Sequence, residues 1–216
     1  MVRPLVRGKS AAALRVERAE LVRHRSHVIA TSEQWLVDAE VRETRRALQR
    51  KARLGTKLPI LGFLDADFLA VADRSTLHMA IIDAAVSVGG AAAADLQLYD
   101  CGMGLLRIVE QRGFSAPFLD FFARVGPATP TACAAAWATG TPVVVERVTR
   151  SPIFAGQSTL EVMVDAGSRA VASYPLLGLG GSVAGVLSFH YPKLPADGAG
   201  AALMAHGAAS ALALLS

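Results

Sequence analysis

The sequence predicts an α+β fold built on a central antiparallel sheet of five to six strands, preceded by a basic helical segment. Short runs of alternating apolar and polar residues, separated by glycine-rich turns, indicate the strands, and helical periodicity flanks them. Charge divides the chain, because residues 1–57 carry a net +8 and residues 58–216 a net −4. We therefore expect a basic N-terminal segment at 1–57 and a folded domain at 58–216.

Two helices are predicted within the basic segment. Residues Ser10–Arg25 are rich in alanine, leucine, glutamate and arginine, which are good helix formers. Thr31 and Gln34 match a capping box at the start of a second helix, Ser32–Leu54. Arginines interrupt the apolar stripe of the first helix, so the pattern does not support a strong coiled coil.

The domain is expected to begin with a helix and a hairpin. Ser75–Gly89 has apolar residues at helical spacing and is followed by a second glycine, which favours a helix end. Ala93–Asp100 and Leu105–Arg112 alternate apolar and polar residues, and the glycines between them are typical of a turn. These two runs therefore predict paired strands.

The second half of the domain alternates short helices with further strands. The Phe-rich stretch after Gly113 and Thr131–Thr139 are expected to be helical, and Ser151–Ala166 to be a loop with a short helix. β-Branched and apolar runs predict three more strands, Pro142–Val148, Arg169–Leu177 and Val183–Tyr191. Gly198–Leu215 is expected to be a buried terminal helix rather than a membrane span, because it is mostly alanine and glycine.

Composition excludes several classes of protein. Two cysteines without a secretory signal favour a reducing, cytoplasmic location without disulfides. The excess positive charge is confined to the N-terminal segment, so the domain itself is not expected to bind nucleic acid. No spacing typical of a metal site or of a kinase is present, and the LGLGGS segment joins two strands as a turn rather than a phosphate loop.

Alternation along the strands predicts one apolar and one polar face of the sheet. The apolar face is expected to hold Leu96, Leu98, Leu106, Ile108, Leu187 and Phe189. The polar face is expected to hold Gln97, Tyr99, Arg107, Gln111, Ser188 and His190, with Ser173 joining them. The apolar face must meet the terminal helices, whereas the polar face either meets water or lines a cavity.

The order of these segments resembles the GAF domain family, and most closely the GAF domains of bacterial sensor histidine kinases and related signalling regulators. The likeness covers about Arg74 to Ser216 and is carried by the segments LQLYD, LRIVEQRGF, FLDFFARV, TACAAAWATGTPVVVE, VASYPLL and GVLSFHY. It implies terminal helices on one face of the sheet, with short helices and loops over the other.

The resemblance also implies a ligand cavity between the polar face and a roof of apolar side chains. The ligand-binding residues are then expected to be Gln97, Tyr99, Phe114, Phe118, Phe122, Cys133, Trp137, Phe154, Ser173, Ser188 and His190, with Met163 in the roof. Ala134 stands where relatives often have glycine, which implies a smaller or empty pocket. His190 is open to three interpretations: a structural histidine, a contact to a ligand, or a haem ligand.

The leading interpretation is a non-catalytic sensory domain that binds a small molecule or relays a signal through helix-mediated dimer or partner contacts. No cofactor is identified. One alternative is a ligand-free dimerisation scaffold whose basic segment contacts a kinase, an acidic protein or nucleic acid. A further alternative is a thiol-dependent methionine sulfoxide reductase, which would need Cys101 and Cys133 close together.

Overall fold

The computed structural model describes residues 59–178, 180–196 and 198–214. The chain divides into two units, Met1–Arg46 and Ala47–Ser216, and all described residues belong to the second. The helices expected at Ser10–Arg25 and Ser32–Leu54 lie outside the described residues.

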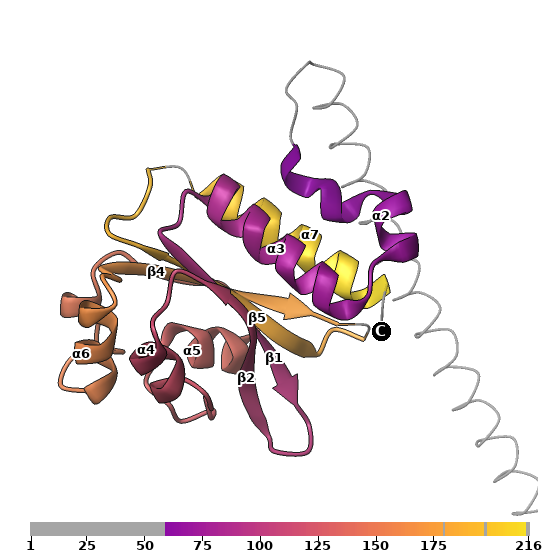
Figure 1. Ribbon diagram of the computed structural model, residues 1–216. Helices are drawn as coiled ribbons and strands as arrows, with labels where there is room; N and C mark the ends of the chain where they lie inside the picture. The colour runs from indigo at the N-terminus through magenta and orange to yellow at the C-terminus, as the bar shows by residue number, and fades with distance from the viewer. Residues whose placement is uncertain (1–58, 179, 197, 215–216) are drawn as a thin grey trace, which may run out of the picture. The chain divides into compact units, whose positions relative to one another are not determined.

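A five-stranded antiparallel sheet forms the centre of the domain (Figure 1). Its strands are β1 (Ala93–Asp100), β2 (Leu105–Arg112), β3 (Val143–Val145), β4 (Ala170–Leu177) and β5 (Val183–Tyr191). Their spatial order is β2-β1-β5-β4-β3, so β5 lies in the middle although it comes last in the sequence. The α+β prediction is confirmed, and the hairpin and β5 have the expected bounds.

Strand β3 is shorter than the sequence pattern predicts. Only Val143–Val145 pair with β4, although the β-branched run extends from Pro142 to Val148. Val148 instead begins the 3-10 helix η2 (Val148–Arg150), and its N–H donates to the carbonyl of Arg169. The side chain of Val148 is fully buried, so this residue is apolar because it belongs to the core and not because the strand continues.

Helices α3 (Arg74–Gly89) and α7 (Ala199–Leu214) lie side by side on one face of the sheet (Figure 1). The 3-10 helix η1 (Pro59–Leu64) contacts both helices, and α2 (Ala66–Val71) contacts η1 at the start of the domain. Asp73 caps α3, accepting a hydrogen bond from the Thr76 N–H at 2.7 Å, and Gly90 ends it in the left-handed region. Across the described parts of residues 59–214, no helix has the length and apolar character needed to span a membrane.

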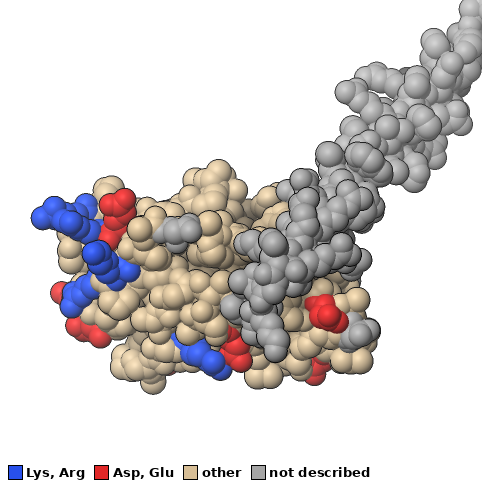
Figure 2. All heavy atoms as spheres, turned by 90° about the horizontal axis from the view of Figure 1, so that it is seen from above, with Lys and Arg blue, Asp and Glu red and all other residues tan. Residues whose placement is uncertain are grey.

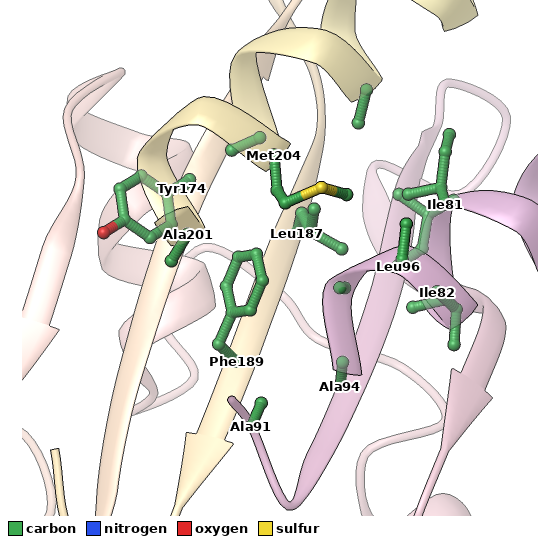
Figure 3. Packing of buried hydrophobic residues seen from close by; sticks show 14 of the residues in the cluster. Ile81, Ile82, Ala91, Ala94, Leu96, Tyr174, Leu187, Phe189, Ala201 and Met204 are labelled. Atoms are coloured by element: carbon green, nitrogen blue, oxygen red, sulfur yellow. The ribbon is translucent and has the colours of Figure 1, made fainter. Parts of the chain in front are cut away.

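The core between these helices and the sheet is built from alternate residues of the strands. Figure 3 shows Met204 and Ala201 of α7 and Ile81 and Ile82 of α3 packed over strand side chains that include Leu96, Leu187 and Phe189. The alanines and glycines of α7 allow close approach, because a Cβ on Gly207 would lie 3.1 Å from Leu64 Cδ1.

A second hydrophobic cluster covers the opposite face. Helices α4 (Ala116–Phe121), α5 (Ala132–Thr139) and α6 (Ser158–Asp165) lie there with their connecting loops (Figure 1). Thr131 caps α5, since its Oγ1 accepts from the N–H of Ala134 at 3.1 Å, and Gly140 ends the helix in the left-handed region. The sheet is therefore covered on both faces, as the resemblance implies.

The expected faces of Leu106, Arg107 and Ile108 on strand β2 are wrong, whereas Gln111 lies opposite Asp95 and is on its expected face. The pairing shifts between Leu96, which lies opposite Glu110, and Gln97, which lies opposite Ile108, so Val109 is an extra residue in a β-bulge. The bulge reverses the alternation, and Leu106 and Ile108 join the cluster beneath α4 and α5 instead of the α3/α7 core. Arg107 lies opposite Leu98 and so is not on the cavity face. The predicted faces hold for β1, β4 and β5.

Candidate functional site

A small buried cavity lies between the sheet and the α4–α6 side of the domain. The sheet contributes Asp95, Gln97, Val171, Ser173, Ser188 and His190, and the covering segments contribute Phe118, Phe122, Thr131, Ala132, Cys133, Phe154 and Met163. Its volume is about 20 Å³ in this conformation. Since a water molecule needs roughly 10–15 Å³ measured in this way, the cavity accommodates a single water-sized group.

His190 is held by two hydrogen bonds across the floor of the cavity. Its Nε2 lies 3.1 Å from Oδ2 of Asp95 on the neighbouring strand β1, and its Nδ1 lies 3.0 Å from Oγ of Ser168. A carboxylate only accepts, so Nε2–H is the donor of the first bond, and Nδ1 and the Ser168 hydroxyl form the second. Both ring nitrogens are therefore engaged within the protein, which leaves neither for haem iron or for a ligand carboxylate without rearrangement.

Two buried acceptors beside this histidine have no partner. Asp95 is 2% exposed and Gln97 is 3% exposed, and both line the cavity. Asp95 Oδ1 and Gln97 Oε1 make no hydrogen bond. Leaving a buried acceptor unpaired costs about 1–3 kcal/mol, and more for a charged group, so a hydrogen-bond donor that enters the cavity would be stabilised at these two atoms.

The remaining polar groups of the cavity bond to one another. Ser173 of β4 and Ser188 of β5 face each other with their Oγ atoms 2.9 Å apart. Cys133 Sγ donates to Thr131 Oγ1 at 3.2 Å. Burial, reinforced by the nearby Asp95 carboxylate, raises the pKa of Cys133 to about 12. This thiol therefore stays protonated at neutral pH and is a poor nucleophile.

Aromatic side chains close the cavity above His190. The rings of Phe114 and Phe118 stack with centroids 3.8 Å apart, and Phe118 packs against Phe122 at 4.6 Å. Phe114 and Phe118 both meet the imidazole edge-on, at 4.8 and 5.7 Å. The α4 segment and the central strand are thus in direct contact through His190.

Most of the expected site residues lie around this one cavity. Eight of the eleven line it: Gln97, Phe118, Phe122, Cys133, Phe154, Ser173, Ser188 and His190. Met163 of the expected roof also lines it. Phe114 lies behind Phe118, while Tyr99 is 41% exposed and packs against Trp137 with ring centroids 5.2 Å apart. Tyr99 and Trp137 extend the same face beyond the cavity.

Four further residues line the cavity that were not among the expected site residues: Asp95, Thr131, Ala132 and Val171. The signal for Asp95 was present, because it lies two residues before Gln97 on an alternating strand and therefore shares its face. A carboxylate in a strand otherwise buried on both sides is unusual enough to mark a site. Thr131 is the N-cap residue of α5.

The cavity contains no set of metal ligands. Within the described parts of residues 59–214, no group of three or more histidine, cysteine, aspartate or glutamate side chains is placed to hold a metal ion. Cys101 is exposed in the β1–β2 turn and Cys133 is buried, and both are free thiols.

Residues 63–211 match the family model described as GAF domain, and the chain belongs to that family. No curated protein matches the chain. Several solved structures share its fold at low sequence identity. The GAF domain of a phosphoenolpyruvate-protein phosphotransferase from Coxiella burnetii is 14% identical, with a TM-score of 0.57 over 72% of this chain and 92% of that one.

Two further structures show the breadth of functions carried by this fold. The GAF domain of an Acinetobacter phosphoenolpyruvate-protein phosphotransferase is 9% identical, with a TM-score of 0.57 over 73% of this chain and 91% of that one. A free methionine-R-sulfoxide reductase from Neisseria meningitidis, solved with its substrate, is 21% identical, with a TM-score of 0.55 over 69% and 82% of the two chains. At these identities the likeness concerns the fold and not the activity.

Proposed function

We propose that this domain is a regulatory sensor that binds a small molecule in the cavity between the sheet and α4–α6. The observation that carries the proposal is the pair of unpartnered acceptors, Asp95 Oδ1 and Gln97 Oε1, buried beneath an aromatic roof. Apolar walls with a few directed polar groups are typical of small-molecule sites. The small volume requires the roof to move outward for any ligand larger than a water molecule.

Strand β5 offers a direct path from the cavity to the helices. His190 faces the cavity, and its neighbours Phe189 and Tyr191 face the α3/α7 core. The Phe189 ring is seated against the last residue of α3, where a Cβ on Gly89 would lie 2.7 Å from Phe189 Cδ1. A shift of β5 on ligand binding would therefore press on the end of α3. For a signal to result, the ligand must favour one of two arrangements of the helices.

The test combines a binding screen with a readout of the helices. Compounds that raise the melting temperature of the full chain would be assayed with Gln97→Met, which keeps the side-chain length but removes the amide. The same substitution at the exposed Gln157 is the matched control. We expect Gln97→Met to abolish binding, and bound ligand to change the rate of amide hydrogen exchange in α3 and α7.

A screen without binders, or a ligand that binds Gln97→Met as well as the wild type, would contradict the sensory proposal. Unchanged exchange in both helices with a bound ligand would contradict the relay to α3 and α7, because a ligand acting through β5 must alter their stability.

A ligand-free interaction scaffold is the second candidate, and the observation that favours it is the small volume of the cavity. Seen from above, which is the helix side of Figure 1, the charged side chains of the described surface lie mostly around its edges (Figure 2). Helix α7 contains no charged residue, and Met79 of α3 and Leu214 of α7 are exposed. Such a surface suits a homodimer or a signalling partner.

The scaffold is tested by oligomeric state and by salt. A native mass equal to one chain at micromolar concentration would contradict a homodimer. The basic segment at 1–57 would supply electrostatic contacts to an acidic partner, and binding that does not weaken with added salt would count against that role.

Thiol redox chemistry is the least supported function. Cys133 is protonated at neutral pH because its pKa is about 12, and the only other cysteine is exposed in a hairpin turn. Turnover of free methionine sulfoxide with a thiol reductant, lost in Cys133→Ser, would reverse this assessment.

A further inference from the structure

We propose that the cavity recognises the ammonium group of a small primary amine, with Asp95 and Gln97 as its acceptors. This inference rests on the proposed ligand-binding function of the same cavity and names the chemical class of its ligand. The first step is hydrogen-bond chemistry. Asp95 Oδ1 and Gln97 Oε1 accept and do not donate, and neither has a partner. A ligand that satisfies both atoms must therefore supply at least two donors.

The two acceptors are placed to share one ligand. Asp95 and Gln97 are two residues apart on β1, so their side chains leave the same face of the sheet roughly 7 Å apart along the strand. Ser173 and Ser188 line the same cavity on the two strands that follow in the sheet, and each hydroxyl can accept as well as donate. An –NH3⁺ group has three N–H donors, which matches two orphan acceptors and one hydroxyl.

Charge favours a cation over an anion or a neutral donor. Asp95 is the single carboxylate among the lining residues, and neither lysine nor arginine lines the cavity. His190 uses both ring nitrogens within the protein. The first turn of α5 also borders the cavity, and its positive end reduces the cost of burying the carboxylate. The N-terminal turn of α5 gives Asp95 Oδ1 no hydrogen bond, so the ligand can form a charge-assisted hydrogen bond with this oxygen.

Size and walls restrict the cation further. A metal ion lacks ligands here, because one carboxylate and no cluster of three suitable side chains are present in the described part of the chain. A cavity of about 20 Å³ holds a group the size of water, which an ammonium group matches. The carbon chain of the amine would extend between Phe118, Phe122 and Phe154, whose ring faces attract a cation.

The test is a titration of the full chain with ammonium chloride and the n-alkylammonium chlorides from methyl to butyl. Sodium and potassium chloride at equal ionic strength, sodium propionate and N-methylacetamide are the comparison solutes. We expect the amines alone to raise the melting temperature and to shift the amide resonances of β1 near Asp95. Asp95→Asn should weaken amine binding at least tenfold, because a charge-assisted bond is lost, and Gln97→Met should also weaken it.

Asp165→Asn, a like substitution at an exposed position, should bind as the wild type does. An equal response to potassium would refute the claim that the ligand donates N–H hydrogen bonds. Binding of propionate or N-methylacetamide in place of the amines would refute the claim that the ligand is a cation. In either case a cavity ligand is still found and the proposed function stands. If neither these solutes nor a broad screen yields a binder, both the ligand class and the proposed function fail. Should Asp95→Asn not fold, Gln97→Met decides the outcome.

Discussion

Replacing Gly185 with alanine should destabilise the domain, because β5 is packed between β1 and β4 at this point. An alanine Cβ would lie 2.3 Å from the carbonyl oxygen of Gln97 and 2.8 Å from Leu98 Cδ2. An ordinary C···O contact is about 3.3–3.6 Å, so β1 and β5 would have to separate locally by about 1 Å. Overpacking of this kind costs roughly 1–3 kcal/mol, and one or two stretched ladder hydrogen bonds add about 1 kcal/mol each.

Part of this cost is offset, because alanine loses about 0.5–1 kcal/mol less backbone entropy than glycine on folding. We therefore expect Gly185→Ala to lower the free energy of unfolding by about 3 kcal/mol and the melting temperature by roughly 6–12 °C for a domain of this size. The assay is urea unfolding followed by far-UV circular dichroism. Gly62→Ala is the matched control, since a Cβ there meets nothing within 4 Å. If Gly185→Ala unfolds at the same urea concentration as Gly62→Ala, the inference that β1 and β5 lie too close at Gly185 to admit a Cβ is refuted.

Three other predictions concern groups elsewhere in the domain. In the folded protein at about pH 8, exposed Cys101 should react with an aromatic disulfide reagent, whereas Cys133 should not, because its pKa is about 12. Rapid labelling of Cys133 in the folded Cys101→Ser variant would refute this. Burial lowers the pKa of His78 below 6.5, so the unfolded state binds more protons than the folded state and the stability should fall as the pH drops below about 6.5. The urea midpoint of His78→Gln should depend less on pH than that of the wild type. The same pH dependence in both proteins would refute this. Leu96→Ala should lower the free energy of unfolding by about 2–5 kcal/mol in the same assay, because Leu96 is fully buried. Leu177→Ala, at a half-exposed position, should lower it by under about 0.5 kcal/mol, and equal losses in the two variants would contradict the assigned core.

Much of this fold was predictable because local signals agreed with the tertiary structure. Period-two alternation and turn glycines located both strands of the first hairpin, and Gly90 and Gly140 end helices where the sequence places them. Strand faces were predictable wherever the pleat continued without interruption, as for Ser188 and His190 on β5. These signals are local, so they can be interpreted without knowledge of the partner strand.

Two features could not be predicted because they depend on the partner. The extra residue Val109 is defined only by the register of β2 against β1, and it moves Leu106 and Ile108 to the cavity side. The hydrogen bond between Asp95 and His190 joins residues that are 95 positions apart in sequence. Asp95 was not among the expected site residues, and the strand order that places β1 beside β5 is needed to identify the pair.

The bulge at Val109 also bears on how the domain remains separate from other sheets. Strand β2 is an edge strand of the sheet. At its N-terminal end, the backbone N–H and carbonyl groups of Leu106 are hydrogen-bonded to those of Val125. After Leu106, a second strand pairing with β2 would meet backbone donors and acceptors whose regular spacing is interrupted at Val109. Exposed Arg107 and Arg112 flank the same stretch, so an incoming strand would also have to desolvate fixed charges. The irregularity that misled the prediction of side-chain faces therefore opposes amyloid-like growth from this edge.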